Sequence, residues 1–211
     1  MIAFGAYILV GIVNLVSAFY FKESLRKTTK CLLMPTLLVF YLLQAGQVHF
    51  AIVAAIVFSW AGDALLLLKE KPLFFRLGLA AFLLSHVFYI TAFLTYAGSL
   101  NYLALAISAV VAFPVTRTIL KKLDAPKPMK TPVAAYATVI ILMSMAALQL
   151  MLAWPALSTV LIFSASLIYI YSDSYMAYLL FHEQPKYFNL ITMIPYIIAQ
   201  SGIILGLVLA F

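Results

Sequence analysis

Charged residues are scarce in this sequence. Only 9% of its 211 residues are Asp, Glu, Lys or Arg, whereas 66% are hydrophobic. A soluble domain carries about 25% charged residues, so a water-exposed surface cannot be built from this composition. We therefore expect one all-α domain over residues 1–211, a bundle of membrane-spanning helices joined by short loops, with membrane lipids as its surroundings.

Cysteine and histidine are also rare. Cys31 is the single cysteine, which excludes an internal disulfide. The three histidines, His49, His86 and His182, are expected at three different depths of the bilayer, so they cannot converge on one zinc ion. The sequence contains neither a Gly-rich phosphate loop nor a Gly-x-Ser-x-Gly motif. We predict no metal site and no cofactor.

Long apolar runs alternate with short polar breaks along the whole chain. A helix needs about 20 predominantly apolar residues to cross a bilayer. The first run lacks a basic N-terminal region and a clear cleavage site, so we interpret it as a retained span rather than a signal peptide. Eight spans are predicted, near residues 1–21, 31–46, 50–68, 74–96, 100–120, 131–152, 155–181 and 188–211.

The 13 Lys and Arg residues all fall at the first, third, fifth and seventh breaks between these spans. The positive-inside rule places such breaks in the cytoplasm, and therefore both termini on the non-cytoplasmic side of the cell (inner) membrane. We interpret the net charge of +7 as topology information and attraction to anionic lipid headgroups, not as a nucleic-acid interface. The oligomeric state is left open.

A weak internal repeat favours the hypothesis of a tandem 4+4 duplication. Lys30 to Pro35 opens the second predicted span, and Lys130 to Pro132 opens the sixth. Asp63 lies in the third span and Asp173 in the seventh. Four spans separate the members of each pair, so the two halves would share one orientation.

Asp63 and Asp173 are the two acidic residues inside the predicted spans. An ionised Asp at the centre of a span costs about 2.5–3.5 kcal/mol on insertion scales, so such residues usually face a bundle interior or a water-filled cavity. Their distances from the flanking polar residues place both in the cytoplasmic half, at similar depth. One shared functional site is therefore feasible, and a structural hydrogen bond between helices is the alternative.

Other polar side chains are expected in the same layer of the membrane. Ser59 lies four residues before Asp63, and Tyr196 four before Gln200, so each pair shares a helix face. Taken singly, a tyrosine or a histidine in such a helix is more often a packing residue. Together they predict a polar pocket that opens toward the cytoplasmic leaflet, with the positioning residues Lys30, Ser59, His86, Tyr89, Tyr136, Ser172, Tyr196 and Gln200.

Five short segments carry a resemblance to a known family. They are Phe-Ser-Trp-Ala-Gly-Asp at 58–63, Phe-Arg-Leu-Gly at 75–78, Ser-His-Val-Phe-Tyr-Ile at 85–90, Tyr-Ser-Asp at 171–173 and Tyr-Ile-Ile-Ala-Gln at 196–200. In order and spacing they resemble the YhhN-like lysoplasmalogenase family. Lys30 and Pro35 also match the start of that family's second span. Ser85 departs from the glycine expected before His86, which affects packing more than chemistry.

The resemblance implies an eight-span enzyme that hydrolyses the vinyl ether bond of lysoplasmalogens. The products would be a fatty aldehyde and glycerophosphoethanolamine or glycerophosphocholine, and the lysophospholipid would enter from the cytoplasmic leaflet. Such a reaction needs a proton delivered to carbon and then attack by water, which suits two carboxylates in different environments. We assign these roles to Asp63 and Asp173, and the sequence leaves open which is the acid. Lys30 is either a phosphate contact or an ordinary positive-inside anchor.

Three alternatives remain at this stage. Intramembrane acids and a repeat also fit a small-molecule or proton-coupled transporter, although carrier sites usually lie at the bilayer midplane. A zinc-dependent lipid amidase would depend on bound metal. A non-catalytic lipid-binding protein would bury the two aspartates without a cavity between them.

Overall fold

The computed structural model describes residues 2–68, 71–102, 127–180 and 182–211, together with positions 106, 110, 114, 117 and 118. Within this part of the chain the secondary structure is helical, with no strand. The predicted span at 100–120 lies mostly outside the described residues. The helices are α1 (Ile2–Phe19), α2 (Glu23–Gln44), α3 (Phe50–Leu66), α4 (Pro72–Ala97), α6 (Lys127–Ala153), α7 (Leu157–Leu180) and α8 (Phe188–Ala210).

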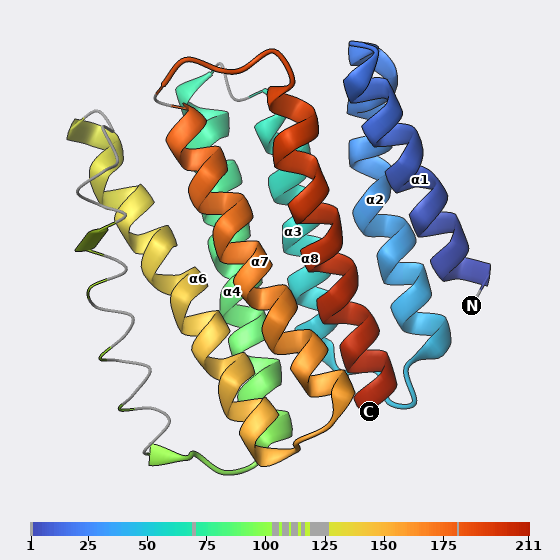
Figure 1. Ribbon diagram of the computed structural model, residues 1–211, viewed down its shortest axis with the longest axis vertical. Coiled ribbons are helices and arrows are strands. Elements are labelled where there is room, and N and C mark those ends of the chain that lie inside the picture. Colours follow the sequence, from blue (N-terminus) through green and yellow to red (C-terminus); the bar gives the residue numbers. More distant parts are fainter. Residues whose placement is uncertain are drawn as a thin grey trace.

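The helices run alternately up and down in one bundle (Figure 1). Neighbours in the chain pack against each other from α1 through α4, α4 packs on α6, and α6 leads through α7 to α8. Helix α8 then returns to α1 and α2, so the arrangement closes around a common interior. A hydrogen bond from the Tyr7 hydroxyl to the Ile197 carbonyl (3.0 Å) ties α1 to α8. Both termini lie at the same end of the bundle (Figure 1).

Five of these helices, α1, α4, α6, α7 and α8, are long and apolar enough to cross a membrane. Helix α3 is apolar but has only 17 residues. Helix α2 has 22 residues, and its first two turns contain Arg26, Lys27 and Lys30, which lower its hydropathy. The protein is thus a polytopic, all-α membrane protein, and its described residues contain five clear candidate spans rather than the eight predicted for the whole chain.

The short second predicted span belongs to a longer helix that extends into its polar N-terminal flank. Helix α2 begins at Glu23 rather than at residue 31, because polar residues extend the helix beyond its apolar stretch. Arg26 pairs with Glu23 one turn earlier (2.7 Å), and the Asn14 side chain of α1 donates to the Arg26 carbonyl and to Thr29 (both 2.9 Å). These contacts hold the charged turns as helix, which a hydropathy pattern alone does not detect.

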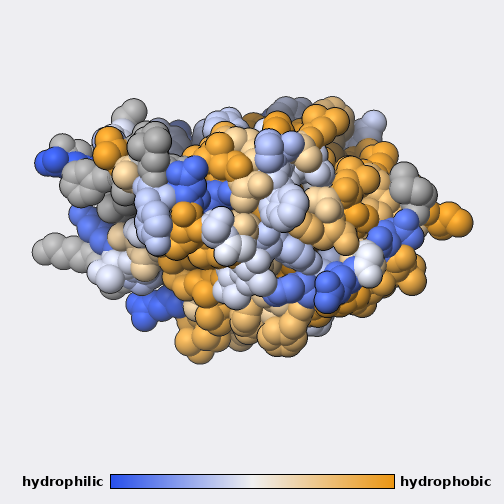
Figure 2. Space-filling view, turned by 90° about the horizontal axis from the view of Figure 1, so that it is seen from below, coloured by the Kyte–Doolittle hydropathy of each residue, from blue (hydrophilic) through white to orange (hydrophobic). Residues whose placement is uncertain are grey.

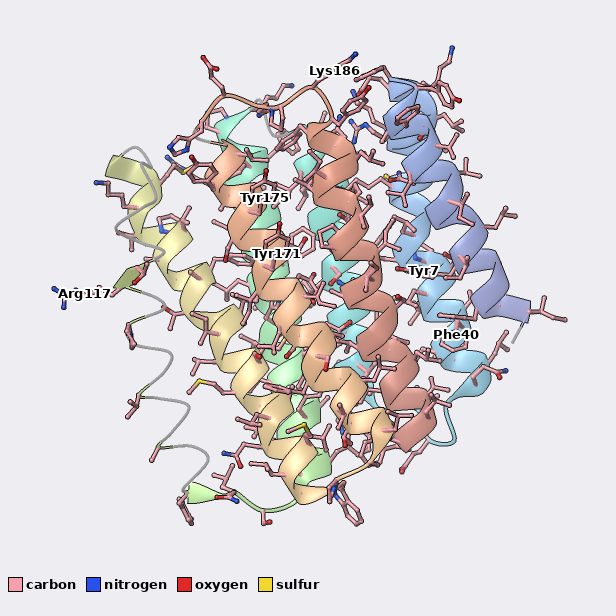
Figure 3. All side chains as sticks on the ribbon, viewed as in Figure 1. Tyr7, Phe40, Arg117, Tyr171, Tyr175 and Lys186 are labelled. Atoms are coloured by element: carbon pink, nitrogen blue, oxygen red, sulfur yellow. The ribbon has the colours of Figure 1, made fainter. Side chains whose placement is uncertain are left out.

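The sides of the bundle are apolar, as a lipid environment requires. Large hydrophobic residues such as Leu9, Ile12, Leu43 and Leu209 expose between 53% and 66% of their surface. Figure 2, which views the end of the bundle that carries the termini, shows hydrophobic side chains along much of its perimeter. Lys186 lies at the opposite end (Figure 3). This separation of apolar sides from polar ends is typical of a membrane protein.

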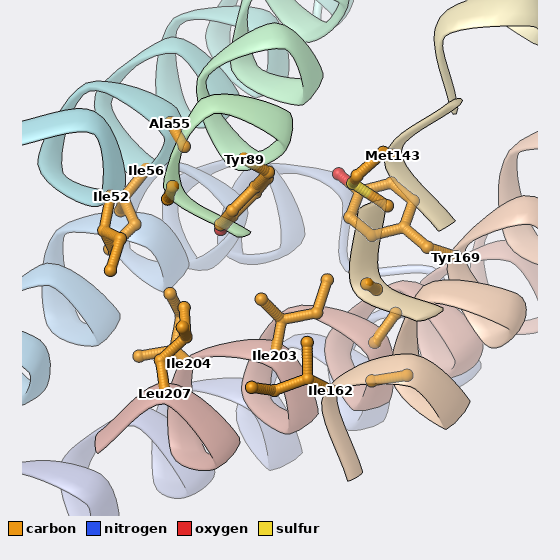
Figure 4. Packing of buried hydrophobic residues seen from close by; sticks show 14 of the residues in the cluster. Ile52, Ala55, Ile56, Tyr89, Met143, Ile162, Tyr169, Ile203, Ile204 and Leu207 are labelled. Atoms are coloured by element: carbon orange, nitrogen blue, oxygen red, sulfur yellow. The ribbon is translucent and has the colours of Figure 1, made fainter. Parts of the chain in front are cut away.

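The interior holds a cluster of buried hydrophobic side chains, among them Ile162, Ile203 and Leu207 (Figure 4). Glycines let the helices around this cluster approach closely. Gly202 and Gly206 form a Gly-x-x-x-Gly pattern on α8 that faces α7. A Cβ atom added at Gly206 would lie 2.5 Å from the Ile162 side chain and 2.8 Å from the Ser158 carbonyl oxygen. Because Ser158 offers its backbone at this contact, α7 itself would have to move. The glycines therefore set the spacing of α7 and α8.

Replacing Gly206 by alanine is expected to destabilise the protein by about 1–3 kcal/mol, since overpacking forces the backbone apart. Thermal unfolding in detergent would measure the loss. Gly5→Ala is the matched control, because a Cβ atom at Gly5 would meet nothing within 4 Å. Equal melting temperatures for the two variants would show that the α7–α8 contact is looser than described.

Candidate functional site

Asp63 lies buried on α3 with two partners from other helices. Its Oδ1 atom is 3.3 Å from the Nζ atom of Lys30 on α2, and its Oδ2 atom accepts a hydrogen bond from the Tyr196 hydroxyl on α8 (2.6 Å). The side chains of Lys30 and Asp63 expose only 14% and 2% of their surface. A buried carboxylate is tolerated when a cation and hydrogen-bond donors compensate for the lost water, and Asp63 has both.

Asp173 on α7 has a different environment. Its Oδ2 atom accepts a hydrogen bond from the Tyr136 hydroxyl on α6. Among the described residues, no lysine or arginine lies within ion-pair distance of Asp173. Both aspartates are buried, at 1% and 7% exposure. The two carboxyl groups thus differ in kind, one paired with an ammonium group and the other with a phenol.

The two aspartates line one small cavity of about 20 Å³. A space of about 10–15 Å³ or more holds one water molecule when polar groups surround it. Four other polar residues supply such groups, and apolar side chains close the remaining walls. The lining consists of Lys30, Asp63, Leu66, Phe82, Ser172, Asp173, Met176, Thr192 and Tyr196. One water molecule between two carboxyl groups therefore fits this cavity.

A second polar layer lies about one helical turn deeper and is organised by Gln200. The Gln200 amide nitrogen donates to the hydroxyls of Ser59 (3.1 Å) and Tyr169 (2.8 Å), and its oxygen accepts from Tyr89 (3.0 Å). Ser59 also bonds to Ser85 (2.8 Å). One amide thus joins α3, α4, α7 and α8. Because these groups satisfy one another, the layer can hold the four helices in register without contacting a ligand.

His86 lies beside this layer with one nitrogen unpaired. Its Nδ1 atom is 2.5 Å from the Phe82 carbonyl oxygen, so Nδ1 carries the proton and Nε2 is the acceptor. The buried Nε2 atom has no hydrogen-bond partner among the described residues. The imidazole packs edge-on against the rings of Tyr136 (5.4 Å between centroids) and Tyr169 (4.8 Å). An unsatisfied buried acceptor is unusual and often marks a functional position.

A larger cleft of about 440 Å³ lies next to the small cavity. Lys30, Leu66, Met176 and Thr192 line both, so the two spaces adjoin. The cleft lies among the N-terminal turns of α2, the start of α8 and the loop before α8. Its polar lining is Glu23, Arg26, Lys27, Lys30, Gln184, Lys186, Asn189 and Thr192. The carboxyl groups are thus reached from the basic end of the bundle.

The residues expected in one layer are divided between these places. Lys30, Asp63, Ser172, Asp173 and Tyr196 line the small cavity. Tyr136 donates a hydrogen bond to Asp173 but does not itself line the cavity. Four other predicted residues do not line it either: Ser59, His86, Tyr89 and Gln200. These four lie about one turn deeper, since residues four apart on a helix differ by about 6 Å along its axis, and their role in positioning a substrate stays a prediction.

Several residues of the site were not in the sequence-based set. Thr192 lies one turn before Tyr196, so helical spacing from a known site residue was an available signal. Phe82 and Met176 are apolar, and no pattern distinguishes a cavity wall from ordinary core. Lys27 and Lys186 could not be distinguished from the other basic residues at the same end.

No group of three or more His, Cys, Asp or Glu side chains in the described residues lies close enough together to hold a metal ion. The fold and the site together define a class of protein: a polytopic helical membrane protein with two buried carboxyl groups at the inner end of a basic cleft.

Comparison with known families makes this class specific. The sequence pattern of the YhhN family matches residues 25–207. The chain belongs to the YhhN family, as its motifs predicted. No curated protein and no solved structure shows significant similarity to it. The matched region begins in the first turn of α2 and ends within α8, so it includes every residue that lines the small cavity and every residue of the cleft except Glu23.

The unpaired nitrogen of His86 leads to a prediction about stability. His86→Leu keeps a similar volume and removes a buried acceptor that has no partner, so stability should stay the same or rise by about 1 kcal/mol. If His86 serves the reaction as an acid–base group, the same variant should lose roughly 10²- to 10⁴-fold in turnover. Thermal unfolding and a turnover assay on one preparation would measure both. A large loss of stability would instead make His86 a packing residue.

Proposed function

We propose that this protein hydrolyses the vinyl ether bond of lysoplasmalogens, releasing a fatty aldehyde and a glycerophospho-alcohol. One observation supports this most: Asp63 and Asp173 line the same cavity, which has room for one water molecule. Vinyl ether hydrolysis consumes one water and needs an acid and a base beside it. Membership in the YhhN family agrees with such an activity.

The different partners of the two aspartates support different roles for them in the proposed reaction. Lys30 compensates a negative charge on Asp63, so Asp63 is the ionised carboxylate. Asp173 has a phenol and, among the described residues, no cation at ion-pair distance, and a buried charge without a counter-ion is costly. Asp173 therefore holds a proton and is the general acid. The sequence alone left these two roles open.

The reaction then follows in balanced steps. Asp173 donates its proton to the vinyl carbon that is not bonded to oxygen, which leaves an oxocarbenium ion stabilised by Asp63. Water adds to the cationic carbon and gives a proton to Asp63. The resulting hemiacetal collapses when Asp63 protonates the leaving oxygen and Asp173 takes the proton of the hemiacetal hydroxyl. Both carboxyl groups return to their starting states, as in two-carboxylate glycoside hydrolysis.

The membrane topology that suits this reaction has eight spans, with both termini on the non-cytoplasmic side. The described helices place both termini at one end of the bundle and Lys186 at the other (Figures 1 and 3). An eighth helix over 100–120 would keep this alternation. The repeat hypothesis also agrees with the packing order, because α2, α3 and α4 would correspond to α6, α7 and α8. The substrate would then enter from the cytoplasmic leaflet.

Aldehyde release from a purified lysoplasmalogen by the detergent-solubilised protein tests the proposal. The wild type should release one aldehyde for each glycerophosphoethanolamine formed. The saturated ether analogue should remain intact, because it lacks the double bond that accepts the proton. A folded wild-type protein that releases no aldehyde from ethanolamine or choline substrates would exclude this function.

A transporter remains the second candidate, since buried acids beside a polar cleft also suit proton-coupled transport. Uptake of a lysolipid into proteoliposomes without chemical change would favour it over hydrolysis. The two readouts use the same purified protein, so a single preparation decides between them.

A further inference from the structure

We infer that the basic cleft is a binding site for the phosphate group of the lysolipid, with Lys27 and Lys186 as its main contacts. The inference rests on the proposed function for the identity of the lipid, and it adds the residues that recognise the headgroup. Its starting point is that cationic side chains from two separate parts of the chain meet around one space. Lys27 comes from α2, and Lys186 from the loop before α8.

The cations of the cleft differ in how far they are already used. Arg26 holds both carboxylate oxygens of Glu23, at 2.7 and 3.2 Å, and Asn189 also contacts Glu23 (3.5 Å). Lys30 pairs with Asp63. Within the described part of the chain, neither Lys27 nor Lys186 forms an ion pair. These two ammonium groups therefore remain for an anion that enters the cleft.

Lys186 is also held in place by aromatic rings. Its Nζ atom lies 5.9 Å from the centre of the Phe21 ring and 5.4 Å from that of Tyr187. Cation–π contacts of this kind restrict a flexible side chain and retain its charge. The ammonium group is thus restrained at the edge of the cleft, where the residue stays exposed to solvent.

Positive-inside topology alone does not account for this convergence. Lys71 and Lys130 are also exposed at polar helix ends, yet neither lines the cleft. A topology signal requires charge on one side of the membrane and no particular cavity. The cleft, at about 440 Å³, falls within the usual range for a small-molecule site and adjoins the carboxylate cavity.

The arrangement also fits the order of groups in a lysoplasmalogen. Its phosphate is separated from the vinyl ether by the glycerol carbons, and the alkyl chain follows on the other side of the ether. A phosphate in the cleft would leave the glycerol at the residues shared by both spaces, Lys30 and Thr192. The ether would then reach the two aspartates. A phosphate ester on a single-chain lipid is therefore the ligand class.

Binding measurements on the full-length protein in detergent test this without requiring hydrolysis. The probes are a saturated 1-O-alkyl lysophosphoethanolamine, the chain-matched alkylglycerol without phosphate, and inorganic phosphate. The double variant Lys27→Gln/Lys186→Gln should bind the phospholipid roughly five- to tenfold more weakly, as expected for the loss of two exposed charge contacts. Binding of the alkylglycerol should not change. Added salt should reduce the difference in phospholipid affinity between the wild type and the double variant, because salt screens exposed charges.

Lys71→Gln/Lys130→Gln is the matched control, with the same change in net charge and unchanged affinity expected for every probe. If Lys27→Gln/Lys186→Gln lowers the affinity for the phospholipid and for the alkylglycerol equally, the inference is overturned. The lysines would then act on folding or on binding of the alkyl chain. Inorganic phosphate that binds as tightly as the phospholipid would also overturn it, since the lipid would contribute nothing. If wild-type protein binds the ether lipid as expected but releases no aldehyde from a lysoplasmalogen, the headgroup site stands and the proposed hydrolysis fails.

Discussion

Asp173→Asn should reduce aldehyde release from a lysoplasmalogen by roughly 10²- to 10⁴-fold, the usual contribution of a general acid. The amide can still accept the hydrogen bond from Tyr136, so the α6–α7 contact survives, but it has no acidic proton to give to carbon. The variant should bind the saturated ether analogue with wild-type affinity. The loss should therefore appear in kcat and not in KM.

Tyr136→Phe is the companion variant to Asp173→Asn. It removes the phenol that contacts Asp173 and keeps the acid itself, so it should reduce turnover less than Asp173→Asn does. Wild-type turnover in a folded Asp173→Asn protein would remove Asp173 from the mechanism. A larger loss in Tyr136→Phe than in Asp173→Asn would instead make the phenol the proton donor.

Breaking the Lys30–Asp63 pair should have the largest effect on stability. Either Lys30→Met or Asp63→Asn leaves one buried charge without its partner, which costs about 3–5 kcal/mol in comparable pairs. Thermal unfolding in detergent should show a clear decrease in melting temperature for each single variant. Turnover should be lost in Asp63→Asn, because the base and the cation stabiliser are gone.

The double variant Lys30→Met/Asp63→Asn separates the structural effect of the pair from its chemical effect. With both charges removed, stability should recover most of the loss, since the neutral amide keeps its contact with Tyr196. Turnover should remain absent. If the single variants melt at the wild-type temperature, the ion pair contributes no stability and Lys30 is a surface anchor.

The sequence predicted the class of fold, and it singled out two acids that lie at one cavity in the structure. Apolar runs located six of the seven described helices closely, and the cost of burying a charge singled out Asp63 and Asp173. The apolar pattern does not mark where α2 begins, because the first turns of this helix are polar. The depth of Ser59 and Gln200 relative to the cavity was missed because spacing along one helix gives a face, whereas depth and register between helices depend on packing.

The roles of the two acids could not be derived from the sequence for a similar reason. Lys30 lies on α2 and Asp63 on the next helix, α3. Tyr136 and Asp173 are likewise on successive helices, 37 residues apart. The order of residues in the chain does not reveal which carboxylate pairs with the lysine and which with the phenol. That pairing follows from how α2 packs on α3 and α6 on α7.

The order of these partners along the chain bears on how the protein is made. Each aspartate has a partner on a helix that is synthesised earlier: Lys30 precedes Asp63, and Tyr136 precedes Asp173. When the helix that carries an aspartate reaches the bilayer, a compensating group is already present in the preceding hydrophobic hairpin. Insertion can therefore proceed two helices at a time, without an uncompensated acid in lipid. A delay in the insertion of α2, or its insertion in the opposite orientation, should accordingly impair the insertion of α3 more than that of the apolar α4.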